Sequence, residues 1–178
     1  PKNKEDYHKI IDIQAVSVYK RLDYIGIQKT VLGVSGGLDS TLALLSLCHM
    51  TDKFKLDRKN IIAVIMPSQN TSKLTYQNAK ALVKALKVTT MEIDIDNDVE
   101  AQMKLINHSG KADTTYENIQ ARFRYYTLMN LANLHQGIVI GTSDMSEVAL
   151  GWSTFNGDHM AMYGINSGLP KTVVRKVV

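Results

Sequence analysis

The segment Ser35–Ser40 reads SGGLDS and holds the residues best suited to chemistry. A short apolar run precedes it and a helical pattern follows it. The segment would therefore form the N-terminus of a helix, where its backbone N–H groups are unpaired and lie at the positive end of the helix dipole. The two glycines lack Cβ atoms and let an anion approach the backbone, and the two serines add hydroxyl donors. The segment predicts a phosphate-binding loop, although it lacks the Lys of a Walker A loop and the G-x-G-x-x-G pattern.

An acidic residue, Asp39, lies inside this anion-binding loop. Its carboxylate would repel phosphate unless a cation lay between them, and Mg²⁺ commonly bridges carboxylates and polyphosphates. Asp39 could instead act only as a helix cap, but a cap and a phosphate site share one design. The loop resembles the SGGxDS loop of the ATP pyrophosphatases, which split ATP between the α and β phosphates and include GMP synthetases and NAD synthetases. The loop alone does not choose among them.

A second motif, residues 141–159, reads GTSDMSEVALGWSTFNGDH and follows another apolar strand. Ligands of open α/β sheets bind at the carboxyl ends of strands, so this motif and the first should face one crevice. Thr142 could donate to phosphate, and Glu147 could be a second Mg²⁺ ligand. The plainer alternative is a helix capped by Ser143 or Asp144 with Glu147 on the surface. The string resembles the GTSDxSExxLGW segment of glutamine-dependent NAD synthetases.

Two further signals involve basic residues. Asn118 and Arg122 are four residues apart and share a helix face, where Arg122 could clamp a carboxylate or phosphate. Alone they would indicate a surface ion-pairing face, but they resemble the YENxQAR segment of the same family. Lys171 follows Pro170 at an expected helix start, where the dipole disfavours a cation, so it could face phosphate rather than solvent.

The resemblance runs from about Tyr7 to the last residue and is to the synthetase domain of glutamine-dependent NAD synthetases. It implies ATP, deamido-NAD and ammonia as substrates and Mg²⁺ held by Asp39 and Glu147, which with Asp158 would be the catalytic residues. The implied ATP contacts are Gly33, Val34, Ser35, Gly36, Gly37, Leu38, Asp39, Ser40, Thr142 and Lys171. The implied deamido-NAD contacts are Asn118, Arg122, Glu147, Trp152, Ser153, Thr154 and Phe155.

Hydrophobic periodicity predicts the elements that position these residues. Strands are expected at 30–34, 60–67, 89–95 and 138–140. Helices are expected at 7–25, 41–50, 76–86, 99–106, 116–135, 146–150 and 169–178, with a turn at 35–40 and loops at 68–73, 107–115 and 151–168. Strands that alternate with helices imply parallel βαβ units. The expected fold is α/β, a three-layer αβα open parallel sheet, which the resemblance assigns to the adenine nucleotide alpha hydrolase-like (HUP or PP-loop) type.

Composition sets the broad class. The chain has 178 residues, a net charge of +4, 44% hydrophobic residues and 21% charged residues, typical of one globular domain rather than a disordered chain. A single cysteine, Cys48, excludes a disulfide scaffold and favours a cytoplasmic location. No apolar run approaches the ~20 residues of a membrane span, no signal peptide opens the chain, and scattered basic residues do not indicate nucleic-acid binding.

We therefore expect one NAD synthetase domain over residues 1–178, excised from a longer protein whose glutaminase domain and C-terminal end are absent here. The resemblance also implies a homodimer or higher homo-oligomer, with subunits joined across the long helix 116–135. Two alternatives stay open: another PP-loop ATP pyrophosphatase, such as a GMP synthetase-like amidotransferase, and a nucleotide-binding module without catalysis.

Overall fold

A parallel five-stranded sheet in the order β3-β2-β1-β4-β5 forms the centre of the computed structural model, which describes residues 3–68 and 71–178. The strands are β1 (Lys29–Gly33), β2 (Ile61–Ile65), β3 (Thr89–Glu92), β4 (Gly137–Gly141) and β5 (Tyr163–Gly164). The helices are α1 (Lys4–Ile25), α2 (Leu38–Lys53), α3 (Lys73–Leu86), α4 (Asp96–Leu105), α5 (Thr114–His135), α6 (Met145–Leu150) and α7 (Lys171–Val177), with a 3₁₀ turn, η1, at Arg58–Asn60.

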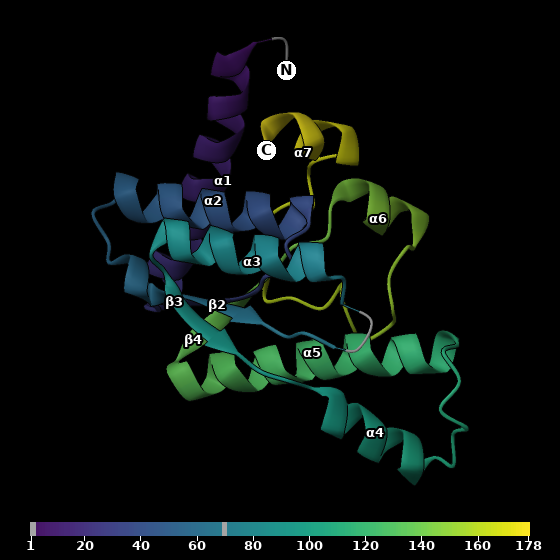
Figure 1. The fold of residues 1–178 in the computed structure, drawn as a ribbon. Helices are drawn as coiled ribbons and strands as arrows, with labels where there is room; N and C mark the ends of the chain where they lie inside the picture. The colour runs from purple at the N-terminus through teal and green to yellow at the C-terminus, as the bar shows by residue number, and fades with distance from the viewer. Residues whose placement is uncertain (1–2, 69–70) are drawn as a thin grey trace.

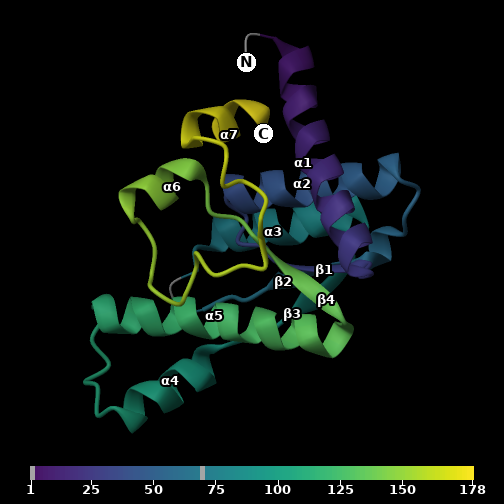
Figure 2. The ribbon, with the colours of Figure 1, turned by 180° about the vertical axis from the view of Figure 1, so that it is seen from behind.

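Helices cover both faces of this sheet. Helices α1, α2 and α3 lie on one face and α4 and α5 on the other, as Figure 1 and the reverse view in Figure 2 show. Because β2 and β4 are buried along their whole length, their sequences are continuous apolar runs rather than alternating ones. The predicted three-layer αβα parallel sheet is confirmed.

Two apolar cores, one on each side of the sheet, hold the layers together. The first joins α1, α2 and α3 to the sheet and includes Val18, Leu44 and Val83. The second joins α4 and α5 to the other face and includes Val99 and Leu128. Helix α7 contacts α1 and α2, with Val174 fully buried, so it closes the fold beside the carboxyl ends of β1 and β4.

Several predicted boundaries were wrong. The turn at 35–40 is shorter than predicted, because α2 already begins at Leu38 with Gly37 as its N-cap. Strand β3 ends at Glu92 rather than at residue 95. Ile95 instead occupies the N-cap position of α4, and its side chain is buried. Helix α2 ends at Lys53 rather than at residue 50, and α1, α3 and α4 each begin three residues earlier than predicted. The bounds of β1, β2, β4, α5, α6 and α7 and the end of α4 differ from the predicted ones by one or two residues.

The predicted loop 151–168 contains a fifth strand, β5. This strand has two residues, too few for any periodicity to reveal, and it pairs with β4 through Ile140 and Gly141. In the predicted loop 68–73, residues 69–70 lie outside the described residues.

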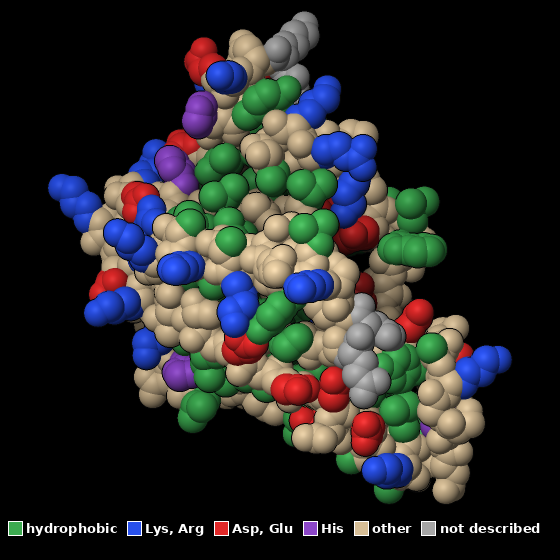
Figure 3. All heavy atoms as spheres, in the orientation of Figure 1, with side chains coloured by type: hydrophobic (Ala, Val, Ile, Leu, Met, Phe, Trp, Pro, Cys, Tyr) green, Lys and Arg blue, Asp and Glu red, His purple; other side chains and the backbone are tan. Residues whose placement is uncertain are grey.

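The molecular surface in Figure 3 shows Lys and Arg side chains spread over the face that carries α2 and α3, with acidic and polar side chains among them. In the described residues no helix is long and apolar enough to span a membrane.

Candidate active site

Three carboxyl groups converge at the carboxyl ends of β1 and β4. Asp39 lies in the first turn of α2, Asp144 is the N-cap of α6, and Glu147 lies one turn into α6. Each offers an oxygen, and these oxygens all lie within 4.8 Å of one another. The structure thus brings the predicted pair Asp39 and Glu147 together and adds Asp144, whose side chain is fully buried.

The α6 capping box orients two of these carboxylates. Asp144 Oδ1 accepts from the Glu147 backbone N–H at 2.9 Å, and Glu147 Oε2 accepts from the Asp144 N–H at 3.3 Å. Each cap uses one oxygen and leaves the other, Asp144 Oδ2 or Glu147 Oε1, directed at the cluster. Helix capping and cation binding, which the sequence presents as alternatives, are therefore compatible roles of the same two residues.

A lysine from α7 lies at the centre of the cluster. Lys171 Nζ is 2.6 Å from Asp39 Oδ2, 2.8 Å from Asp144 Oδ2 and 2.9 Å from Glu147 Oε1. Burial alone would lower the pKa of Lys171, but its bonds to the three carboxylates outweigh burial and raise that pKa. Burial alone would raise the pKa of the Asp144 carboxyl group. The Lys171 ammonium and the nearby backbone N–H groups outweigh burial and lower that pKa.

The cluster has the chemistry of a divalent-cation site. Three carboxylates and one ammonium leave a formal charge of −2, since −3 + 1 = −2. Asp39 Oδ1 is buried and has no hydrogen-bond partner among the described residues. Carboxylate oxygens are the ligands that Mg²⁺ prefers. An unpartnered buried oxygen in a cluster with net negative charge fits an additional cation.

The glycine-rich loop lies beside this cluster and is held in shape by its own side chains. Ser35 Oγ accepts from the Gly37 N–H at 3.2 Å, and Ser40 Oγ donates to the Gly37 carbonyl at 3.2 Å. Gly36 has a φ of +82°, and a Cβ there would lie 2.1 Å from the Thr75 carbonyl oxygen of α3. Glycine is thus required at this position by packing against α3 as well as by backbone conformation.

The first turn of α2 has no side-chain cap, which leaves its N–H groups available to an anion. Of the predicted ATP contacts, Gly33 ends β1, residues 34–37 form the loop, and Leu38 and Ser40 lie in this first turn.

Two adjoining cavities flank the loop. The first, of about 480 Å³, has a largely apolar lining that includes Val34, Ile65, Met66 and Ala79. The second, of about 220 Å³, is lined by residues that include Ser35, Ser40, Arg124, Tyr125, Thr142 and Asp158. Burial raises the pKa of Tyr125 to about 12, against its hydrogen bond with Thr142, so its phenol stays neutral.

Arg124 lines both cavities and was not singled out from the sequence. Its guanidinium donates to Ser68 Oγ at 2.9 Å and to Gln120 Oε1 at 3.3 Å, both of them neutral acceptors. Burial lowers the pKa of Arg124, against a weaker opposing effect of Asp96. A cation that is partly buried between two cavities and bonded to neutral groups is suited to an anionic ligand.

The residues predicted to contact the dinucleotide join α5 to the loop 151–159. Asn118 Oδ1 accepts from Thr154 Oγ1 at 2.8 Å, and Arg122 Nε donates to the Phe155 carbonyl at 3.1 Å. Asp158 Oδ1 accepts from the Thr154 N–H at 2.6 Å.

The two aromatic residues of this loop face solvent: Trp152 is 77% exposed and Phe155 is 74% exposed, and Ser153 is exposed as well. The structure thus places these predicted contacts on one loop but not around a closed pocket.

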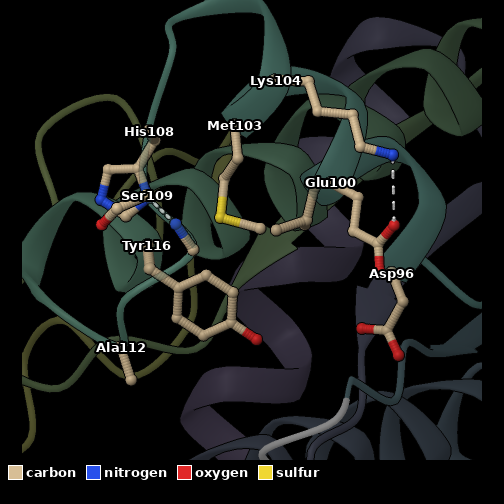
Figure 4. A pocket seen from close by; sticks show the side chains of 10 residues that line it. Asp96, Glu100, Met103, Lys104, His108, Ser109, Ala112 and Tyr116 are labelled. Atoms are coloured by element: carbon tan, nitrogen blue, oxygen red, sulfur yellow. Dashed lines mark hydrogen bonds and ion pairs between the residues drawn. The ribbon is translucent and has the colours of Figure 1, made fainter.

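A third cavity, of about 410 Å³, lies away from the carboxylates, between α4 and the connection to α5. Figure 4 shows Lys104 paired with Glu100 on one side and His108 and Tyr116 on the other. None of the predicted site residues lines it.

The fold is that of the NAD synthases. The NAD synthase family model matches residues 10–178, and the chain belongs to that family. The chain is 42% identical over 181 residues to the glutamine-dependent NAD(+) synthetase of Mycobacterium leprae, an alignment that covers 98% of this chain and 27% of that protein. It is 36% identical to the NH(3)-dependent NAD(+) synthetase of Thermoplasma volcanium over 86% of this chain and 59% of that protein.

Solved structures agree. The glutamine-dependent NAD+ synthetase of Acinetobacter baumannii, in complex with ADP, superimposes with a TM-score of 0.88 at 27% identity and covers 96% of this chain and 32% of that one. The NH3-dependent NAD synthetase of Campylobacter jejuni superimposes with a TM-score of 0.86 at 26% identity, over 96% of this chain and 71% of that one. In the alignment with the Mycobacterium leprae relative, the chain spans 27% of the length of that protein.

Proposed function

We propose that this chain catalyses the ATP-dependent amidation of deamido-NAD to NAD+. The observation that carries the proposal is the convergence of Asp39, Asp144 and Glu147 beside a glycine-rich loop and an uncapped helix start. Family membership and the likeness to an ADP-bound synthetase support it.

The chemistry accounts for the residue types. A carboxylate is a poor electrophile, so the nicotinate carboxylate of deamido-NAD first attacks the α-phosphorus of ATP, and pyrophosphate leaves. Ammonia then attacks the resulting acyl adenylate, loses a proton and displaces AMP. Phosphoryl transfer of this kind depends on positioning and charge neutralisation more than on a protein nucleophile.

The carboxylates Asp39, Asp144 and Glu147 would hold Mg²⁺, which when bound neutralises charge on the polyphosphate. Lys171 occupies the same cluster, so we infer that its ammonium contacts ATP phosphate instead when nucleotide and cation are bound. The uncapped start of α2 would hold pyrophosphate through its N–H groups, and Thr142 and Arg124, which line the smaller cavity, would add donors.

The larger apolar cavity beside Val34 and Ile65 would take the adenine ring. The loop 151–159 and the α5 residues Asn118 and Arg122 would bind deamido-NAD. Asp158 would orient or deprotonate ammonium at the smaller cavity, which it lines.

Ammonia would come from solution or from a glutaminase domain, since the Mycobacterium leprae relative is named glutamine-dependent and the Thermoplasma volcanium relative NH(3)-dependent. We also propose that residues 1–178 form a single synthetase domain and that its location is cytoplasmic.

A homodimer is proposed across α4 and α5, whose outer surfaces expose Leu105, Tyr126 and Leu134. A homodimer formed there would cover these side chains.

The test is pyrophosphate release from ATP with deamido-NAD and ammonium chloride, together with NAD+ formation measured by a coupled dehydrogenase. We expect sustained turnover, with both products in equal amounts, only when all three substrates are present. Pyrophosphate release with xanthosine monophosphate in place of deamido-NAD would instead indicate a GMP synthetase-like enzyme. ATP binding with no turnover on either substrate would indicate a non-catalytic module.

A further inference from the structure

A buried amide links the two segments that carry Asp39 and Asp144, namely the start of α2 and the loop after β4. Asn166, which follows β5, is fully buried. Its Nδ2 donates to the backbone carbonyl of Asp39 at 2.9 Å and to the backbone carbonyl of Thr142 at 3.0 Å. Asp39 carries one carboxylate of the cluster, and Thr142 lies two residues before Asp144, which carries another. One NH₂ group therefore bridges the start of α2 and the loop after β4.

Two more buried polar side chains fix the orientation of this amide. Gln14 of α1 donates from Nε2 to Asn166 Oδ1 at 3.0 Å and to the Ile165 carbonyl at 2.8 Å. Gln14 Oε1 accepts from Ser46 Oγ of α2 at 2.8 Å. Every amide nitrogen in this chain of bonds meets acceptors and every amide oxygen meets a donor, so neither amide could be reversed without losing bonds.

The surroundings make a packing role insufficient. Gln14, Ser46 and Asn166 come from three separate segments and lie in or beside an otherwise apolar core. Buried polar groups stabilise less than apolar ones of similar size unless all their bonds are formed, and a complete network fixes one geometry. Such a network is favoured where the relative position of the segments that it joins must be fixed.

The carboxylate cluster requires a fixed separation of the segments that carry it. The side chains of Asp39, Asp144 and Glu147 repel one another, because their oxygens lie within 4.8 Å. A neutral cross-link between the two loop backbones opposes that repulsion without occupying any carboxylate oxygen. We propose that Asn166, held by Gln14 and Ser46, is a positioning residue that sets the separation of the two loops and thereby the affinity of the cluster for Mg²⁺. This inference rests on the proposed function, because it concerns the cation site of that function.

The experiment compares Asn166→Leu with wild type by titrating Mg²⁺ into protein and a non-hydrolysable ATP analogue and recording nucleotide binding. Loss of groups that orient metal ligands commonly lowers metal affinity by about 10- to 100-fold, so the Mg²⁺ midpoint should rise at least about tenfold. Adenosine binding without Mg²⁺ should change little, because neither Asn166 nor its partners Gln14 and Ser46 line the cavity proposed for adenine.

Ser167→Ala is the matched control, because its exposed hydroxyl donates to the Gly164 carbonyl at 2.9 Å and has no bond to either carboxylate segment in the part of the chain that the structure describes. Its Mg²⁺ midpoint should equal that of wild type. A lower melting temperature for Asn166→Leu with an unchanged Mg²⁺ midpoint would overturn the proposal, since a merely structural role moves only stability.

If Asn166→Leu does not fold, Gln14→Met provides the test, because it keeps both bonds of Asn166 to the loops but frees the amide to rotate. A rise of severalfold in the Mg²⁺ midpoint supports the proposal, and an unchanged midpoint overturns it. A wild-type protein that binds adenosine and the nucleotide without any response to Mg²⁺ would instead refute the proposed function.

Discussion

Replacing Lys171 by methionine removes the only cation that the described residues place within ion-pair distance of the three carboxylates. Without it, Asp39, Asp144 and Glu147 face one another at 4.8 Å or less. With an effective dielectric constant near 20, two unit charges at that distance repel by about 3.5 kcal/mol. One carboxyl group would therefore bind a proton, which limits the loss of stability.

Removing one partner from a buried ion pair costs about 3–5 kcal/mol, and partial exposure of Asp39 and Lys171 reduces this figure. We expect Lys171→Met to lose about 3 kcal/mol, which for a domain of this size is roughly 6–12 °C in the melting midpoint. Calorimetry near neutral pH measures the loss. Lys176→Met is the matched control, since Lys176 is an exposed lysine on the same helix.

The sign of the pH dependence is a second readout. In Lys171→Met a carboxyl pKa would lie above its unfolded value, so stability gained by protonation is present at low pH and falls as pH rises. Lowering pH from about 8 to about 5.5 should therefore recover part of the loss in the variant. In wild type the raised pKa of Lys171 and the lowered pKa of Asp144 act outside this window, so their contribution is flat across it.

Millimolar MgCl₂ should likewise raise the melting midpoint of Lys171→Met more than that of wild type, because no ammonium competes for the carboxylates. A variant as stable as Lys176→Met, with no response to pH or Mg²⁺, would refute the electrostatic reasoning.

Three other outcomes are expected. Arg124→Gln should weaken ATP binding by about 10- to 100-fold, measured by calorimetry, because a hydrogen bond to a charged group is lost, while adenosine binding stays near wild type; equal losses for both ligands would contradict a phosphate contact. Gly36→Ala should cost about 1–3 kcal/mol in urea unfolding because of its φ of +82° and the contact with Thr75, whereas Gly168→Ala, where a Cβ meets nothing within 4 Å, should be close to neutral. Glu147→Ala should leave ATP binding measurable but abolish pyrophosphate release; unchanged rates would remove Glu147 from the cation site.

Local patterns in the sequence were enough to predict the three layers of the fold and the positions of the two main motifs at the ends of β1 and β4. The strands β1, β2 and β4 are buried apolar runs, and their burial in a parallel sheet is what makes those runs continuous. Ligands of open α/β sheets bind at the carboxyl ends of the strands, and this rule predicts from the sequence that Asp39 and Glu147 face one crevice.

The missed features depend on contacts between distant segments. The sequence predicts only a helix-capping role for Asp144, because the capping pattern is the same whether the second carboxylate oxygen is free or bound to Lys171. Asn166 and Gln14 are 152 positions apart, so their bond leaves no local pattern. Arg124 lies two residues after Arg122 on α5, and only the fold shows that it lines the cavities beside the loop.

A crystal structure with MnCl₂ and a non-hydrolysable ATP analogue tests the central claim most directly, because Mn²⁺ takes the same oxygen ligands as Mg²⁺ and is located by its anomalous scattering. We expect an anomalous peak bounded by the carboxylates of Asp39, Asp144 and Glu147, with Lys171 turned toward the phosphates. A peak elsewhere, with Lys171 still bonded to all three carboxylates while nucleotide is bound, would contradict it.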